Sequence, residues 1–168
     1  MKGQEERTQL RGKDVCRKDD PKIILRGEID SLYSRAVLTC VYAKQYGAEQ
    51  VISGLEDIVR AVRELMRGEA LGQEPDISYI NGMDFDELRH VSHNVESELG
   101  LVPYFPDEFT DDVTAYINLL RTDIRRTERA AVAAGEDRVT RAIQLVLNRL
   151  SSAAYILMLE NRAERYGE

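Results

Sequence analysis

Residues 121–129, with the sequence RTDIRRTER, place four arginines in nine positions. The guanidinium group presents its N–H donors in a planar fork that suits the oxygens of phosphates and carboxylates. The whole chain of 168 residues has 30 acidic and 23 basic side chains, for a net charge of −7. A local basic cluster in an acidic protein indicates either one small anion bound at one place or a set of internal ion pairs.

A helix over residues 117–131 would distribute the charged side chains of this segment unevenly. Successive residues of a helix are about 100° apart, which predicts a buried face made of Ile117, Leu120, Ile124, Thr127 and Ala131. Arg121, Arg125 and Glu128 fall beside that face. Arg126 is predicted to point to solvent, and Arg129 lies between the two directions. An arginine that borders a core needs a partner, and either an internal salt-bridge network or a bound polyanion would supply one.

The other residues with chemical potential give weaker signals. His90 and His93 lie three residues apart on an expected helix, a spacing that a metal could use. No further ligands lie nearby in the sequence, so both are interpreted as surface or packing residues. Cys16 and Cys40 match no metal or redox spacing, and we expect them to be reduced. No Ser–His–Asp or Cys–His arrangement for nucleophilic catalysis is evident.

The elements that position these residues are predicted to be helices, because apolar residues recur every three or four positions almost throughout. The expected helices cover about 21–46, 49–67, 84–100, 110–134 and 137 to near the C-terminus. Asp20 and Thr110 are the expected N-caps of the first and fourth helices, and Gly68 is the expected stop of the second. Short turns between long helices favour antiparallel neighbours, so the expected fold is all-α, a five-helix up-and-down bundle.

Residues 1–20 are dominated by charged and polar side chains, with Leu10 and Val15 as the sizeable apolar residues. Such a segment buries too little apolar surface to offset its ordering entropy. We therefore expect a flexible N-terminal arm over 1–20 and one helical domain over 21–168. We interpret no apolar run as long enough to span a bilayer and no segment as a leader, which predicts a cytoplasmic protein without membrane contact. The acidic balance argues against nucleic-acid binding.

The final helix is predicted to be apolar on two sides. One face holds Ile143, Leu147, Leu150, Ala154 and Leu157. The opposite face holds Leu145, Tyr155 and Ile156, with Asn148 and Ser152 among them. A helix that is apolar on two sides packs against two partners. One is the rest of the bundle, and the second is expected to be another subunit, a ligand or both. Taken alone, Asn148 is equally well explained as a satisfied buried amide.

Several stretches resemble, in order, the motifs of the ATP-dependent corrinoid (cobalamin) adenosyltransferases. These are RKDDPKIILRGEIDSL at 17–32, RTDIRRTER at 121–129 and LNRLSSAAYILML at 147–159. DELRHVSH at 86–93, NLLRT at 118–122 and LNRLSS resemble the ethanolamine-utilisation branch of this family more than the propanediol branch. Together the matching stretches extend over about residues 11–160.

The resemblance implies a ferritin-like five-helix bundle that forms a homotrimer with active sites between subunits. The implied reaction moves the 5′-deoxyadenosyl group of ATP to cob(I)alamin and releases triphosphate. Asp30 and Arg121 match a pair that forms a salt bridge across the subunit interface in the family. The implied partners are a corrinoid reductase or a cobalamin-dependent enzyme, and the implied location extends to a bacterial microcompartment.

The resemblance also assigns ligand-binding roles. Arg125, Glu128 and Asn148 match residues that hold ATP and its Mg²⁺, and Lys18 matches a lysine near the phosphates. Arg125 with Mg²⁺ would neutralise charge on the leaving group, and Glu128 would orient the metal or the sugar.

Tyr104 and Phe105 lie in the aromatic stretch GLVPYFPDEF, where the family places an aromatic that keeps the lower axial position of cobalt free of ligand. Loop residues that close the end of the bundle are an equally good explanation of both side chains.

Two differences from the family's patterns keep other functions open. The first residues, MKGQEERTQLRGKDV, contain no Thr- and Gly-rich loop of the kind that wraps the triphosphate in the propanediol type. The sequence also shows no cysteine-rich metal motif of the ethanolamine type. The alternatives are a non-catalytic corrinoid- or nucleotide-binding bundle and a purely structural helical assembly protein. Stabilisation of the folded chain by Mg-ATP would separate a binding protein from a structural one.

Overall fold

The structure is a computed structural model that describes residues 6–10 and 15–167. Its helices are α1 (Pro21–Gln45), α2 (Glu49–Leu71), α3 (Phe85–His93), α4 (Val95–Leu99), α5 (Asp112–Ala133) and α6 (Arg138–Tyr166). Two antiparallel hairpins accompany them, made of β1 (Arg7–Gln9) with β2 (Val15–Arg17) and of β3 (Tyr79–Ile80) with β4 (Met83–Asp84). The predicted all-α helical bundle is confirmed, although the helix count and several helix ends differ.

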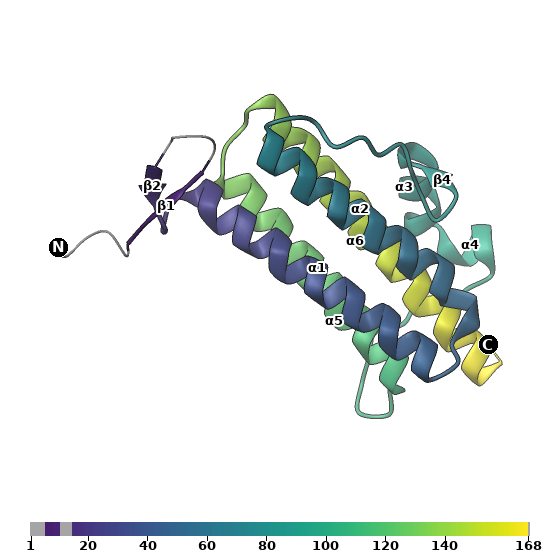
Figure 1. Cartoon of the computed structure of the whole chain (residues 1–168). Helices are drawn as coiled ribbons and strands as arrows, with labels where there is room; N and C mark the ends of the chain where they lie inside the picture. The colour runs from purple at the N-terminus through teal and green to yellow at the C-terminus, as the bar shows by residue number, and fades with distance from the viewer. Residues whose placement is uncertain (1–5, 11–14, 168) are drawn as a thin grey trace.

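Four long helices form the body of the molecule (Figure 1). α1 packs on α2 and on α5, and α6 also packs on both α2 and α5. The pair α1 and α2 therefore lies on one side of the bundle, and the pair α5 and α6 lies on the opposite side. α3 packs on the outside of α6. This arrangement creates a three-helix junction of α3, α5 and α6, and the candidate site lies there.

The predicted third helix is in fact two, because the helix breaks at Asn94. The Asn94 side-chain Nδ2 donates to the carbonyl oxygen of His90 at 2.8 Å, and that oxygen is the acceptor that the Asn94 backbone N–H would use in a continuous helix. The backbone N–H donates instead to Val91 O at 3.0 Å. A side chain that competes with the backbone in this way favours a helix end.

Two further helix ends differ from the predictions. α2 continues through Gly68 to Leu71 and is capped by Gly72, which adopts the left-handed conformation with φ of 67°. Gly68 serves packing instead, since a Cβ there would lie 2.8 Å from Gln73 O. The N-cap of α5 is Asp111, whose Oδ1 accepts from Thr114 N at 3.0 Å. Thr110 caps nothing because its hydroxyl accepts from Asp107 N in the preceding loop.

The core confirms the predicted inner face of α5, whose five members are all fully buried. The second apolar side of α6 has a different explanation from the predicted one. Ile156 is buried, and α3 and β3 of the same chain pack on α6. Leu145 remains 45% exposed and Tyr155 is half-buried, so a narrower strip of α6 is left for a ligand or a partner.

The apolar run of α6 is longer than predicted, since no run in the sequence was expected to be long enough to span a bilayer. By length and composition this helix could cross a membrane, but 67% of its most apolar stretch is buried inside the bundle. Burial against neighbouring helices is the expected state of the central helix of a bundle. The absence of membrane contact stays a prediction.

The N-terminal segment forms the β1–β2 hairpin at the end of the bundle where α1 begins (Figure 1). Arg26 of α1 reaches it through Nη1, which donates to Gln9 O at 3.3 Å, and the same guanidinium holds the buried Glu69 of α2 in a two-pronged ion pair. The flexibility of residues 1–20 stays a prediction, and its residues 1–5 and 11–14 lie outside the described ranges. Cys16 and Cys40 are both free thiols, and burial raises the pKa of Cys40.

Candidate anion-binding site

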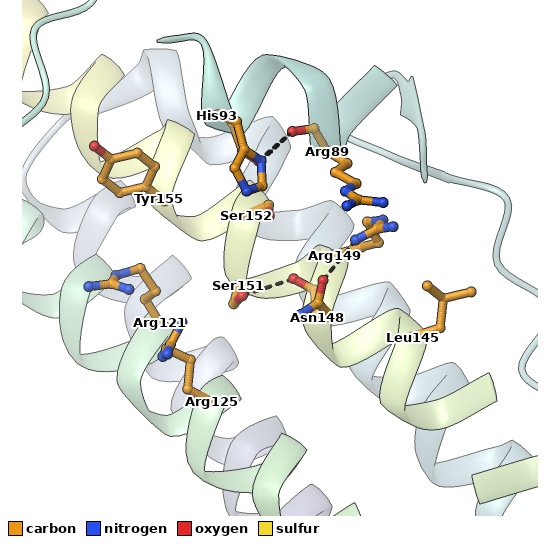
Figure 2. Close-up of a pocket in the computed structure, with 11 residues that line it drawn as sticks. Arg89, His93, Arg121, Arg125, Leu145, Asn148, Arg149, Ser151, Ser152 and Tyr155 are labelled. Atoms are coloured by element: carbon orange, nitrogen blue, oxygen red, sulfur yellow. Dashed lines mark hydrogen bonds between the residues drawn. The ribbon is translucent and has the colours of Figure 1, made fainter. Parts of the chain in front are cut away.

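A cleft of about 540 Å³ opens at the junction of α3, α5 and α6 (Figure 2). Its walls are formed by Arg89, Ser92 and His93 of α3, Arg121 and Arg125 of α5, and Leu145, Asn148, Arg149, Ser151, Ser152 and Tyr155 of α6. Four of these side chains are arginines, and no carboxylate is among them. The cleft therefore has a positive potential that favours an anion.

Two arginines of α5, Arg121 and Arg125, line this cleft and have no carboxylate partner among the residues that the structure describes. Arg121 is half-buried, its Nε lies 3.4 Å from Asn118 Oδ1, and its guanidinium lies 5.9 Å from the centre of the Tyr155 ring. Burial lowers the pKa of Arg121, and the like charge of Arg125 lowers it further. Arg125 is exposed and forms no ion pair with any residue that the structure describes. Neither charge is neutralised by a carboxylate among the described residues.

Arg126, the next residue of the same segment, is neutralised within the protein. Its Nε donates to Glu28 Oε2 of α1 at 2.7 Å, and its Nη1 donates to Asp123 Oδ1 at 2.9 Å. The hydrogen bond to Glu28 is the main reason that the pKa of Arg126 is raised. Asp123 is only 7% exposed and also accepts from Arg35 of α1 at 2.9 Å. The prediction that Arg126 points to solvent was therefore incomplete, because a wheel of α5 cannot show the carboxylate that α1 contributes.

A hydrogen-bonded chain links α5 and α6 beside the cleft. Asn148 Nδ2 donates to Glu128 Oε1 at 2.9 Å, and Arg149 Nη1 donates to Asn148 Oδ1 at 2.7 Å. The Asn148 amide is thereby oriented by a carboxylate on one side and a guanidinium on the other. Of the predicted site residues, the structure brings together Arg121, Arg125, Glu128 and Asn148.

Sequence reasoning missed two cleft arginines. Arg149 is adjacent to Asn148 and is the one charged side chain in the apolar stretch 142–159, which is a signal that the sequence did contain. Arg89 gave no comparable signal, because only the packing of α3 on α6 brings it to the cleft.

Lys18 and Asp30 lie away from the cleft. Lys18 is exposed in the turn after β2, where its backbone N–H donates to Glu6 O at 2.8 Å. Asp30 lines a different groove, between α1 and α2, together with Arg26 and Glu69. That groove is on the opposite side of the bundle from α5 and α6, so one chain does not pair Asp30 with Arg121.

Tyr104 and Phe105 lie in the loop before α5, at the end of the bundle remote from the β1–β2 hairpin (Figure 1). Tyr104 is held in place, because the Arg162 guanidinium stacks on its ring at 3.7 Å and its hydroxyl contacts Asp107 and Thr110. Phe105 is 75% exposed. Phe105 is therefore exposed at the surface, whereas Tyr104 packs against Arg162 and stabilises the loop.

Glu128 could serve as a carboxylate ligand of an Mg²⁺ ion that binds together with phosphates. In proteins Mg²⁺ is usually bound by one or two carboxylates and takes its other ligands from substrate phosphates and water. Glu128 provides one carboxylate next to the cleft, through its contact with Asn148. Within the described ranges no three His, Cys, Asp or Glu side chains gather into a metal site, so the metal would be held mainly by a bound nucleotide.

These features define a helical-bundle protein with a basic cleft. The family model for cobalamin adenosyltransferase matches residues 1–160, and the chain belongs to that family. It is 30% identical over 159 residues to the corrinoid adenosyltransferase EutT of Escherichia coli strain K12 and to EutT of Salmonella typhimurium. Each alignment covers 90% of this chain and 57% of the relative, so the chain spans little more than half the length of these proteins. The predicted likeness to the ethanolamine-utilisation branch is confirmed.

Solved structures agree on the fold. A variant PduO-type ATP:corrinoid adenosyltransferase from Lactobacillus reuteri, complexed with cobalamin and ATP, superposes with a TM-score of 0.74 at 20% identity and covers 98% of this chain and 93% of its own. A second variant of that enzyme, complexed with ATP, gives a TM-score of 0.71 at 21% identity over 98% and 94% of the two chains.

The two neighbouring arginines of α5 should differ in their effect on the stability of the ligand-free protein. Arg126→Ala should lower the free energy of unfolding by about 1 kcal/mol or more, because it removes two charge-assisted hydrogen bonds, one to a buried carboxylate. Arg125→Ala should change it by less than about 0.5 kcal/mol, or raise it, because Arg125 has no carboxylate partner and repels Arg121. Urea unfolding at one fixed protein concentration would measure both, and equal losses would contradict the assignment.

Proposed function

We propose that this protein transfers the 5′-deoxyadenosyl group of ATP to the cobalt of a reduced corrinoid, cob(I)alamin, and releases triphosphate. The observation that carries the proposal is the cleft whose four arginines lack carboxylate partners among the described residues. Membership of the cobalamin adenosyltransferase family supplies the substrate class, and structural relatives are complexed with cobalamin and ATP.

The reaction needs no nucleophile from the protein. The cobalt supplies the electron pair of the new bond to C5′ of ATP, and the C5′–O bond breaks with its pair onto the triphosphate. The protein must align the two reactants and stabilise the negative charge that grows on the leaving group. Arg125, with Arg121 beside it on α5, would carry that role. When bound, Mg²⁺ would add positive charge at the phosphates.

Glu128 and Asn148 would position the nucleotide. Asn148 Nδ2 holds Glu128 Oε1 at 2.9 Å, which fixes the carboxylate at the border of the cleft. From there Glu128 can orient either the metal or the ribose hydroxyls. In this proposal Arg125, Glu128 and Asn148 contact ATP. Lys18 lies away from the cleft of its own chain, so it would approach the phosphates from a neighbouring copy.

A complete site would combine two copies of the chain. Asp30 and Arg121 lie on opposite sides of one bundle, so a salt bridge between them requires a neighbour. A contact between unlike sides of identical subunits generates a ring when the rotation closes. We take that ring to be a homotrimer. The exposed apolar residues Val37, Leu38 and Val41 on α1 are suited to such a contact.

Phe105 is the better candidate of the two loop aromatics for contact with the corrin. Its ring is exposed, whereas Tyr104 is held by Arg162. An apolar ring at the lower face of the cobalt would exclude an axial ligand and make the metal easier to reduce. Because the substrate is Co(I), the reaction also needs a reductase, and we place the protein with it in the cytoplasm or in a bacterial microcompartment.

A purely structural role is disfavoured by the charge distribution. An assembly protein would pair its arginines internally, as this chain does at Arg26, Arg35 and Arg126. The cleft arginines depart from that pattern. A non-catalytic binding protein is the remaining alternative, and turnover decides between it and the enzyme.

The activity is tested by an anaerobic assay with reduced cobalamin and Mg-ATP that follows the loss of cob(I)alamin absorbance. Arg125→Ala should lower ATP affinity or turnover roughly ten- to a hundredfold, because a charge-assisted contact to phosphate is worth about 1.5–3 kcal/mol. Arg125→Lys should rescue only part of the loss, since an ammonium lacks the bidentate fork. Arg141→Ala, on an exposed arginine of α6 outside the cleft, is the control. ATP binding without turnover would support the non-catalytic alternative.

The proposed homotrimeric ring should sediment as a species of three times the chain mass of 19.1 kDa. Asp30→Arg should weaken assembly or activity, because it would place like charges opposite each other. Recovery of the assembled species in the double variant Asp30→Arg with Arg121→Asp would demonstrate a direct pair. A monomer at micromolar protein concentration would rule out the proposed homotrimer.

Alanine substitutions of the two loop aromatics should have different effects, one on cobalt reduction and the other on stability. Phe105→Ala should slow reduction of bound cob(II)alamin with little change in ATP affinity, because it removes the apolar ring from the axial face. Tyr104→Ala should instead lower thermal stability, since the ring packs under Arg162. Phe109→Ala, an exposed aromatic of the same loop, is the matched control. An unchanged reduction rate in Phe105→Ala would exclude the wedge role.

A further inference from the structure

The side of the cleft formed by α3 and α6 contains a second group of basic side chains. Arg89 and His93 come from α3 and Arg149 comes from α6, across from the two arginines of α5 (Figure 2). The proposed nucleotide contacts are those of Arg125, Glu128 and Asn148, with Arg121 beside Arg125 and Lys18 near the phosphates. Arg89, His93 and Arg149 have no role in them.

Arg149 is the strongest sign that this side binds a ligand. Arg149 is only 8% exposed, and its buried Nε has no hydrogen-bond partner in the part of the chain that the structure describes. Nη1 donates to Asn148 Oδ1 at 2.7 Å, which is a neutral acceptor. A guanidinium has five N–H donors, and a charge removed from water without an anionic partner is costly. The bundle thus keeps a buried cation at the wall of an open cleft.

Arg89 adds a second charge at the same place. Figure 2 shows its guanidinium pointing from α3 toward that of Arg149. Neither arginine forms an ion pair with a residue in the described ranges, whereas Arg26, Arg35 and Arg126 each hold a carboxylate. Two like charges that face each other are stabilised by an anion between them.

His93 and two serines complete the set of donors. The Nδ1–H of His93 donates to the Arg89 carbonyl oxygen at 2.7 Å, which leaves Nε2 for another partner. Ser92 and Ser152 bring hydroxyl groups to the same cleft. Guanidinium, imidazole and hydroxyl groups without any carboxylate are the donors that suit a phosphate group.

We propose that Arg149, Arg89 and His93 form a second anion subsite, which binds a phosphate group other than the one held by Arg125. The identity of the molecule that carries this phosphate rests on the proposed function. Two sources share the chemistry, namely the far end of the triphosphate of ATP and the phosphodiester in the nucleotide tail of the corrinoid. The Asn148 amide contacts both Glu128 and Arg149, so one side chain joins the two subsites.

Calorimetric titrations of the 168-residue chain would test the subsite and identify the source. The probes are tripolyphosphate alone, and cobalamin and cobinamide in the presence of Mg-ATP, since cobinamide lacks the phosphodiester. The variants are Arg149→Lys, which keeps the buried charge but loses the fork, and Arg89→Ala, whose exposed position leaves the core intact. Arg141→Ala is the control on α6, and circular dichroism verifies the fold of each.

The expected result is that both variants weaken one phosphate-bearing probe about tenfold and that the control does not. Weaker tripolyphosphate binding would assign the subsite to the nucleotide. Weaker cobalamin binding with unchanged cobinamide binding would assign it to the corrinoid tail. Unchanged affinity for all probes, or equal losses for cobalamin and cobinamide with tripolyphosphate unaffected, would overturn the proposal. Because tripolyphosphate binding requires no turnover, a phosphate subsite in a protein without adenosyl transfer would disprove the proposed function and leave the subsite standing.

Discussion

A guanidinium that leaves bulk water needs an anionic partner, and this requirement organises the charged interior of the protein. Where α1 packs on α2 and on α5, the chain supplies the partner itself, as Glu69 does for Arg26 and Asp123 does for Arg35. Where α3, α5 and α6 meet, it supplies none within the described ranges. The first set of arginines stabilises the bundle, and the second leaves positive charge for a ligand to neutralise.

The scaffold makes this separation possible because each long helix has distinct flanks. α5 turns Asp123 and Arg126 toward α1 and turns Arg121 and Arg125 toward α6. Neighbouring residues of one segment therefore serve opposite purposes. The third wall of the cleft is α3, which ends at His93 because the Asn94 side chain takes the backbone acceptor that would continue the helix. That break places His93 at a helix end beside the cleft.

One copy of the chain presents only part of the machinery that adenosyl transfer would need. The cleft groups the arginines and Asn148, while Asp30, Lys18 and the exposed Phe105 lie on other surfaces. A ring of copies would bring unlike sides together and so combine them. The arrangement would place the corrinoid and the nucleotide where two subunits meet, with the buried charge of Arg149 as a fixed feature of one of them.

The sequence by itself determined the helical class and the buried face of α5, and its resemblance to the family predicted the grouping of Arg121 and Arg125 with Glu128 and Asn148. These follow from periodicity and from ordered motifs, which are local properties of the chain. Only the tertiary structure decided that Arg126 is neutralised by Glu28, that Tyr104 is occupied by Arg162, and that Arg89 and Arg149 share a cleft. The reason is physical. A helical wheel gives the direction of a side chain, but its partner is supplied by another helix, and which helix lies there depends on the packing of the whole chain.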